Sequence, residues 1–312
     1  MNGLLAVADL SGDPRRRAHD RRMQRLLGSS AFITIIISAL ILFVLARGSI
    51  DFFRSIGWDF SVLRDSSKAP GWFPRRERFD LITIVMGSVL IGLIAMLVAV
   101  PLGLGTAVYL SEFAPARVRK ILKPIVEVLA GIPSVIVGYF ALKFIAPNIV
   151  DPIFSPDQSR NMVVAGLAIG VLVIPIMASI SEDALRAVPS SLREASYGIG
   201  ARKSTTTIRI VLPAAVSGIV AAFIIATSRA IGETMVAAMA GGRDGSGPRV
   251  LDPLEPGLTM TAAMTNAAGG TDQVNSGAPF QVLFFVGLLL FMMTMGLNVI
   301  GDRFVQRVRQ QY

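Results

Sequence analysis

The 312-residue sequence has no cysteine and only one histidine, His19. The lack of cysteine excludes disulfides, thiolate chemistry and cysteine-based metal sites, and a single histidine excludes a proton relay built from histidines. A nucleotide-binding loop of the pattern Gly-x-x-x-x-Gly-Lys-Ser/Thr is also missing, so any ATP that drives this protein is hydrolysed by another chain. We therefore expect no catalytic residue, no metal site and no bound cofactor in this chain.

Charged residues are scarce as well. They make up 16% of the chain, whereas 53% of the residues are hydrophobic and the mean hydropathy is +0.61, which excludes an ordinary soluble domain. A transmembrane helix needs roughly 20 mainly apolar residues. Six segments qualify: Leu26–Ala46, Leu81–Leu104, Val126–Ala146, Met162–Ile180, Ala214–Met239 and Phe280–Ile300. Because backbone polar groups in lipid must pair within the protein, the predicted fold class is all-α, a polytopic membrane protein with six transmembrane helices.

The net charge of +9 follows from membrane topology rather than from nucleic-acid binding. If both termini are cytoplasmic, 18 Lys and Arg residues lie on the inner side and 11 on the outer side, with Arg229 inside a predicted span. Basic residues are enriched on the cytoplasmic side of membrane proteins, so this count favours that orientation. A basic tail, residues 1–25, precedes the first span, and we therefore expect no signal peptide.

A polar and basic segment, residues 181–213, separates the fourth and fifth predicted spans. Its spacing predicts a helix that ends near Tyr197, a turn made by two glycines, and a second helix over residues 203–212. Pro213 then opens the next span. A helix-turn-helix laid against the membrane surface is suited to docking into a groove on a partner protein.

This segment resembles the EAA coupling loop of ABC-importer permeases, which contacts the ATPase subunit in that family. Six residues match the family pattern: Glu194, Ala195, Gly200, Ile210, Leu212 and Pro213. Ser196 replaces the second alanine of the pattern, a change between small residues that alters helix propensity little. The resemblance implies that coupling to the ATPase is carried by Arg193, Glu194, Ala195, Gly200 and Pro213.

The third predicted span contains the run Gly131-Ile132-Pro133-Ser134. Such a run is tolerated in lipid where the backbone lines a cavity or meets a close neighbour. The run resembles the Pst-type phosphate permeases, and the resemblance places Ser134 on the substrate pathway. Val137 departs from the aromatic residue expected there. A plain kinked packing helix is the alternative interpretation.

The fifth predicted span contains Arg229, which costs roughly 2.5–3.5 kcal/mol to insert at the centre of a membrane helix. Glu233 follows four residues later, on the same helix face, where it can pair with Arg229. One interpretation is a structural ion pair that fastens the bundle. The other is an anion site, because a guanidinium presents paired donors to phosphate oxygens. In the second, Glu233 also accepts a hydrogen bond from protonated phosphate and so rejects sulfate.

The run Arg-Ala-x-Gly-Glu-Thr-Met, residues 229–235, resembles the C-type permease subunit of the Pst phosphate importer, and Leu258–Ala263 extends the match. The resemblance implies a substrate pathway that includes Arg229, Glu233, Thr234 and Ser134. It also implies the following division: a basic cytoplasmic tail (1–25), an additional first helix (26–48), an extracytoplasmic loop (49–78), a type I ABC permease core of five helices (79–302) and a cytoplasmic tail (303–312). The aromatic residues of the loop, such as Phe52 and Trp72, are interpreted as interfacial anchors.

For such a subunit the resemblance implies several partners: a homologous A-type permease, a homodimeric ABC ATPase that binds ATP and magnesium, an extracytoplasmic phosphate-binding protein, and inorganic phosphate as the substrate. The implied location is the bacterial inner membrane. Two rival functions stay open. One is an ABC permease for another oxyanion, such as molybdate or sulfate. The other is a carrier or channel without ATP, which predicts inverted repeats and no docking loop.

Overall fold

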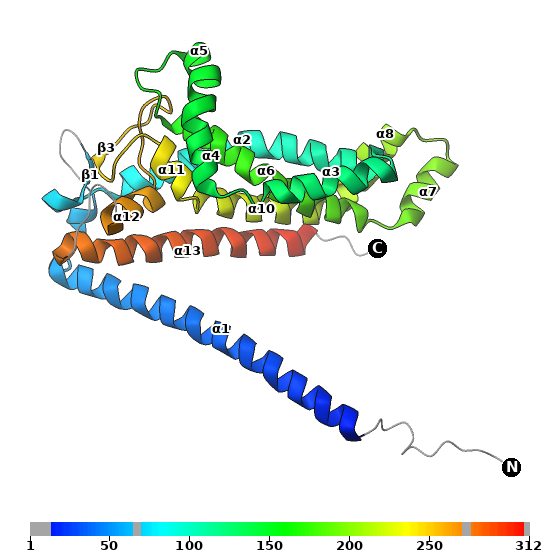
Figure 1. Ribbon diagram of the computed structural model, residues 1–312, viewed down its shortest axis with the longest axis horizontal. Coiled ribbons are helices and arrows are strands. Elements are labelled where there is room, and N and C mark those ends of the chain that lie inside the picture. The colour runs from blue at the N-terminus through cyan, green and yellow to red at the C-terminus, as the bar shows by residue number, and fades with distance from the viewer. Residues whose placement is uncertain (1–13, 65–69, 270–275, 309–312) are drawn as a thin grey trace.

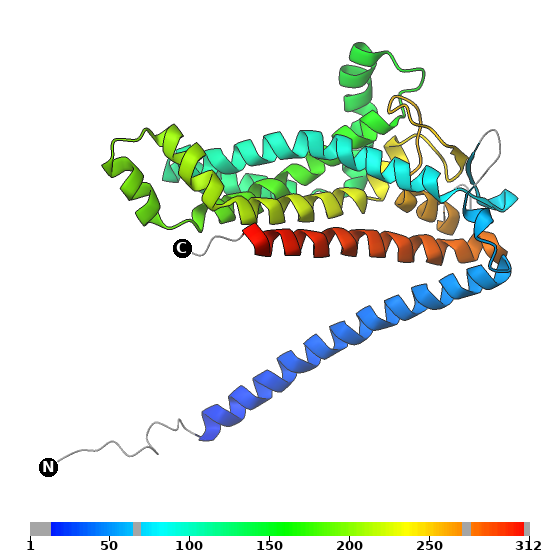
Figure 2. The ribbon, with the colours of Figure 1, turned by 180° about the vertical axis from the view of Figure 1, so that it is seen from behind.

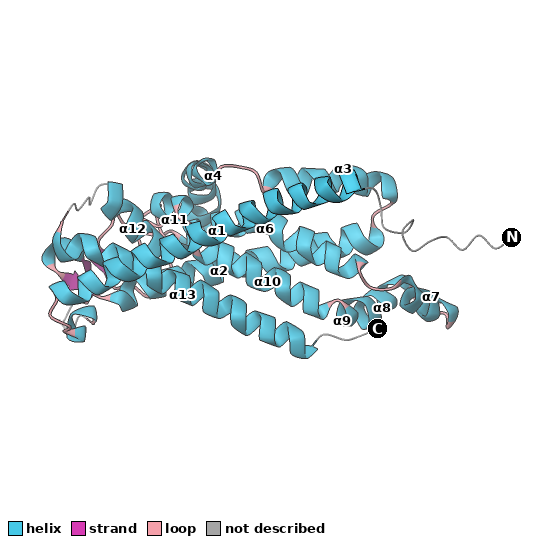
Figure 3. Ribbon diagram, turned by 90° about the horizontal axis from the view of Figure 1, so that it is seen from below, coloured by secondary structure: helices cyan, strands magenta, loops and turns pink. Residues whose placement is uncertain are grey.

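The computed structural model describes residues 14–64, 70–269 and 276–308 of the chain, and helices dominate it (Figures 1 and 3). Helix α6 packs against both α2 and α10, which makes it the centre of the helix bundle, and α13 covers α10. The bounds of these helices are Leu81–Val108 for α2, Met162–Arg186 for α6, Val216–Ile231 for α10 and Gly277–Val308 for α13.

The two ends of the bundle carry different elements (Figure 1). One end, here called the sheet end, carries β1 (Gly71–Phe73), β2 (Arg78–Phe79), β3 (Gly247–Pro248) and α12 (Met260–Gly269). The opposite end, here called the loop end, carries α7 (Ser190–Gly198) and α8 (Lys203–Thr206). Helix α1 (Pro14–Ser55) contacts α13 near the sheet end and diverges from the bundle toward the loop end (Figures 1 and 2).

Within the described residues, five helical segments are long and apolar enough to cross a membrane, and a bent pair of helices makes a sixth. The five are Arg22–Ser55, Leu81–Phe113, Ser134–Phe154, Met162–Arg186 and Gly277–Arg307; the bent pair is Lys203–Ala214 with Val216–Ile231, at 69°. The predicted all-α fold with six spans is confirmed. The first helix continues past the expected limit at residue 48 to Ser55.

The third span differs from the prediction of Val126–Ala146. A separate amphipathic helix, α3 (Ala116–Leu129), ends before the span, and the chain breaks at residues 130–133. The break has a local cause, because Pro133 has no N–H to donate and takes an extended ψ of 130°. The span therefore begins at Ser134. It comprises α4 (Ser134–Phe140), a π-helical stretch (Ala141–Val150) and α5 (Asp151–Phe154).

The fifth span is interrupted, unlike the continuous helix expected over Ala214–Met239. Helix α10 ends at Ile231, residues 232–234 leave the helix, and a short helix, α11 (Met235–Ala240), follows. This interruption places Arg229 in the last turn of α10 instead of the middle of an unbroken helix.

A small antiparallel sheet in the order β2-β1-β3 joins the segment after α1 to the segment after α11. Trp72 lies opposite both Phe79 and Gly247. Phe52, Trp72 and Phe79 are fully buried, and the Phe52 ring stacks on Phe285 of α13 with centroids 5.8 Å apart. The interpretation of Phe52 and Trp72 as interfacial anchors is therefore wrong, because both rings belong to the core.

Candidate functional site

The interruption between α10 and α11 carries the Arg229–Glu233 pair. Nη1 of Arg229 lies 2.7 Å from Oε2 of Glu233. The Glu233 side chain is buried, and its other oxygen accepts a hydrogen bond from the Met235 N–H at 3.2 Å. The Arg229 side chain is 45% exposed in the isolated chain. Both oxygens of Glu233 are thus engaged within the chain, while the side chain of its partner Arg229 is partly exposed.

Helix α12 fastens this interruption from the sheet end. Oγ1 of Thr261 donates a hydrogen bond to the backbone carbonyl of Glu233 at 2.8 Å. The first N–H of α12 donates to Oγ of Ser88 on α2 at 2.9 Å. Gly87 permits this approach, because a Cβ there would lie only 2.1 Å from the carbonyl oxygen of Leu258. The buried start of α12 therefore lies between α2 and the interruption, and its hydrogen bonds hold the backbone of the interruption in place.

The other two predicted pathway residues come from neighbouring elements. Thr234 belongs to the interruption itself and is half-buried. Ser134 is the first residue of α4, which packs against α11. The two helices approach closely at Gly138, where a Cβ would lie 2.9 Å from the sulfur of Met239. This packing places α4 beside α11, and the role of Ser134 in the pathway stays a prediction.

The predicted helix-turn-helix of the coupling loop is present at the loop end. Helix α7 is followed by a turn, and α8 continues as a π-helical stretch (Thr207–Val211) into α9 (Leu212–Ala214). Pro213 is exposed in α9, immediately before the 69° bend into α10. Pro213 therefore lies in the last short helix before the bend into α10, next to the position where the spacing predicts the start of the fifth span.

The turn between α7 and α8 depends on Gly200, whose φ of +81° is the left-handed conformation that glycine adopts without strain. The Gly200 N–H donates to the Tyr197 carbonyl at 2.9 Å, and the Ala201 N–H donates to the Ser196 carbonyl at 3.1 Å. These are the paired bonds of a glycine-terminated helix. The buried hydroxyls of Ser196 and Thr206 lie 2.8 Å apart and join α7 to α8.

The outer face of α7 presents a mixed surface. Glu194 and Ala195 are exposed, Tyr197 is 42% exposed and Ile199 is 86% exposed. Apolar side chains exposed beside a carboxylate are typical of a protein-docking surface. Tyr197 and Ile199 are absent from the predicted coupling residues. An apolar residue within an otherwise polar turn is the sequence feature that would have identified them.

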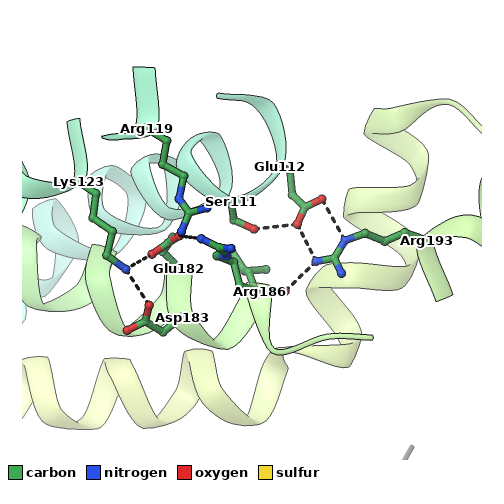
Figure 4. A network of polar contacts seen from close by, with 9 residues as sticks. Ser111, Glu112, Arg119, Lys123, Glu182, Asp183, Arg186 and Arg193 are labelled. Atoms are coloured by element: carbon green, nitrogen blue, oxygen red, sulfur yellow. Dashed lines mark hydrogen bonds and ion pairs between the residues drawn. The ribbon is translucent and has the colours of Figure 1, made fainter. Parts of the chain in front are cut away.

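Arg193, predicted to contact the ATPase, has its side chain engaged within the chain (Figure 4). Its Nη2 lies 2.9 Å from Oε1 of Glu112 at the end of α2. The same guanidinium donates to the carbonyls of Leu185 at 2.8 Å and Val188 at 2.6 Å. With 19% of its side chain exposed, Arg193 fixes α7 to the bundle.

A second carboxylate at the loop end is surrounded by cations (Figure 4). Glu182 of α6 is fully buried and pairs with Lys123, with Arg119 at 2.9 Å and with Arg186 at 3.7 Å. Burial lowers the pKa of Lys123, but hydrogen bonds to Asp183 and Glu182 outweigh this effect and raise it. The network fastens α3 to α6, and it is missing from the sequence-based predictions.

Another buried carboxylate lies at the sheet end. Asp80 is fully buried and accepts a hydrogen bond from the Thr83 N–H at 3.2 Å, which caps α2. Nη2 of Arg249 lies 2.7 and 2.8 Å from its two oxygens. This ion pair ties the segment that follows α11 to the start of α2, and sequence reasoning missed it too.

Comparisons with known proteins agree with this architecture. The family model described as binding-protein-dependent transport system inner membrane component matches residues 99–311. The phosphate transport system permease protein PstC of Mesorhizobium japonicum is 30% identical, over 90% of this chain and 88% of that protein. PstC of Pasteurella multocida is 27% identical, over 90% of each chain.

The solved structures share the fold. A chain of a bacterial alginate ABC transporter, solved with an alginate-bound periplasmic protein, superposes with a TM-score of 0.65 over 94% of this chain and 98% of that chain. At 16% sequence identity this likeness concerns the fold alone, which is the type I fold of ABC-importer permeases. The family model covers more than half of the sequence. The chain therefore belongs to the family of binding-protein-dependent transport system inner membrane components, the permeases of ABC importers.

Proposed function

We propose that this chain is the transmembrane permease subunit of an ATP-driven importer of inorganic phosphate. The observation that carries the proposal is the half-exposed side chain of Arg229, whose guanidinium is held at a helix interruption by a buried carboxylate. A cation held where a membrane helix is interrupted is suited to receive an anion, because charged groups within membrane helices mark substrate and ion pathways. The curated relatives named as phosphate permeases support phosphate as that anion.

Arg229 is the group that meets the phosphate in this proposal, and it offsets the loss of hydration of the anion. Glu233 acts by positioning Arg229, because its side chain is buried and both of its oxygens face partners within the chain. This assignment replaces the expected hydrogen bond from protonated phosphate to Glu233. The hydroxyls of Thr234 and Ser134 both donate and accept hydrogen bonds, so they can accept a hydrogen bond from the protonated oxygen of phosphate, which sulfate lacks near neutral pH.

The proposed complex contains a homologous A-type permease, a homodimeric ATPase that holds ATP and magnesium, and an extracytoplasmic phosphate-binding protein. The exposed face of α7 with Glu194 and Ala195, together with Ile199 directly after the helix, is the proposed contact with the ATPase. The start of α1 and the end of α13 lie toward the loop end (Figure 1), which supports both termini on the ATPase side, in the cytoplasm of a bacterial cell.

Uptake in cells tests this function. Cells that lack the chain are compared with the same cells carrying it, for uptake of labelled phosphate, sulfate and molybdate. Restored uptake of phosphate alone supports the proposal. Restored uptake of sulfate or molybdate alone would establish the rival function as a permease for another oxyanion. The second rival, a carrier without ATP, does not agree with the family of the chain.

Replacing Gly200 with alanine is expected to reduce the amount of phosphate moved per ATP. A residue with a Cβ in the left-handed conformation costs about 1–2 kcal/mol, which favours a different turn between α7 and α8. Gly198→Ala is the matched control, because Gly198 lies in α7 and space around both Cβ positions is open. An equal amount of phosphate moved per ATP in the two variants would contradict the proposal that the turn at Gly200 is needed for coupling.

Replacing Thr261 with valine is expected to raise the KM for phosphate uptake by about 5- to 150-fold, because the buried Glu233 carbonyl loses its donor, which costs about 1–3 kcal/mol. Thr261→Ser keeps the donor and should restore the KM. The control is Thr265→Val, which removes only a hydrogen bond within α12. The same KM in Thr261→Val and Thr265→Val would show that α12 does not hold the site.

A further inference from the structure

Glu112 lies at the end of α2, in a π-helical turn formed by Tyr109–Phe113. The residue is only 8% exposed, and one carboxylate oxygen accepts the Ser111 hydroxyl at 2.7 Å. Both oxygens face Arg193, at 2.9 and 3.4 Å (Figure 4). A π-helical turn adds a residue to the helix and is frequent at functional sites. Here the turn holds a buried carboxylate against the coupling loop.

Arg193 joins three elements through one side chain. It belongs to α7, and its ion pair with Glu112 reaches α2. Its N–H groups also donate to the carbonyls of Leu185 and Val188, at the carboxyl end of α6. Carbonyls at a helix end lack their usual helical partners, so this guanidinium supplies donors where they are needed. The first helix of the coupling loop is therefore fixed to two helices of the bundle.

The second helix of the loop reaches the same turn. Nζ of Lys203, the first residue of α8, lies 5.4 Å from the centroid of the Phe113 ring, within the range of a cation–π interaction. The hydroxyls of Ser196 and Thr206 join α7 and α8 to each other. The turn at the end of α2 therefore receives both helices of the loop, and the loop is internally linked.

We propose that Glu112 is a positioning residue for coupling. Glu112 and Arg193 form a clamp, here called the loop clamp, that makes the coupling loop move as one body with α2 and α6. Without the loop clamp, displacement of a docked loop is absorbed by bending where the loop joins the bundle. This inference rests on the proposed function in so far as ATP hydrolysis drives transport; it does not depend on which anion is carried.

The test is the amount of anion transported per ATP hydrolysed by the assembled complex in phospholipid vesicles. Glu112→Ala is expected to lower this ratio about tenfold, the effect of losing roughly one charge-assisted hydrogen bond. Glu127→Ala is the matched control, because Glu127 is an exposed glutamate on α3. A variant that only folds or assembles poorly lowers transport and hydrolysis together and leaves the ratio at the wild-type value.

A wild-type ratio in Glu112→Ala, or an equal fall in Glu127→Ala, would overturn the loop clamp. If Glu112→Ala fails to assemble, Glu112→Gln carries the test. It keeps the size of the side chain and an acceptor oxygen, and a smaller fall of the ratio is expected. If the wild-type complex moves another oxyanion instead of phosphate, the proposed substrate is wrong. The ratio is then measured with that anion, and the same outcomes decide the loop clamp.

Discussion

Replacement of Arg229 by glutamine is expected to lower phosphate uptake about 10- to 100-fold while the permease remains in the membrane. A hydrogen bond from a charged donor contributes about 1.5–3 kcal/mol, and the half-exposed side chain of Arg229 carries several N–H donors. The measurement is the initial rate of labelled phosphate uptake, divided by the amount of the chain in the membrane and in the assembled complex.

The single variant also leaves the buried carboxylate of Glu233 without its cation, which is itself destabilising. The double variant Arg229→Gln with Glu233→Gln removes that unpaired charge. If Arg229 meets the anion, uptake by the double variant stays as low as uptake by the single variant. If uptake returns in the double variant, Arg229 serves only to neutralise Glu233. The pair is then a structural ion pair of the helix bundle, which is the alternative interpretation of the sequence.

Replacement of Glu182 by alanine is expected to have the largest effect on stability, a loss of about 3–5 kcal/mol. Glu182 is fully buried, and its removal leaves Arg119, Lys123 and Arg186 close together without the carboxylate they share. Mutual repulsion of these cations would separate α3 from α6. The measurement is the midpoint of thermal unfolding of the purified complex in detergent, which should fall.

Asp183→Ala is the matched control for Glu182→Ala. Asp183 is the neighbouring carboxylate in the same network and pairs with Lys123, but its side chain is 70% exposed. An ion pair with so exposed a carboxylate contributes about 0–1 kcal/mol, so the midpoint of thermal unfolding should change little. Equal losses in the two variants would show that burial of Glu182 is not what makes the network stabilising.

The helices and the coupling loop are predictable from the sequence because they depend on residues close together in the chain. Long apolar runs indicate the spans, and the glycine that closes α7 is placed by its spacing from the helix and from Pro213. The pair of Arg229 and Glu233 is predictable for the same reason, since four residues separate them on one helix face.

The span limits fail where one residue outweighs the average hydropathy of its surroundings. Pro133 starts a new helix inside an apolar run and separates α3 from the third span. In the fifth span, Glu233 accepts the Met235 N–H and so stabilises the start of α11 after the interruption. A pattern averaged over a whole span does not register either effect.

The ion pairs that fasten the bundle are missed because their partners are distant in sequence. Lys123 and Glu182 are 59 residues apart, and Glu112 and Arg193 are 81 residues apart. Asp80 and Arg249 are separated by 169 residues. No local spacing indicates these pairs, although each carboxylate stands next to a strongly apolar segment where it must find a cation.

ATP-dependent uptake of labelled phosphate into vesicles tests the central claim most directly. The vesicles hold the purified complex of this chain with its permease partner and ATPase, and the binding protein is added outside. The proposed function predicts uptake that requires ATP, that excess unlabelled phosphate abolishes and that excess sulfate leaves unchanged. Uptake without ATP, or uptake that sulfate abolishes and unlabelled phosphate does not, would contradict it.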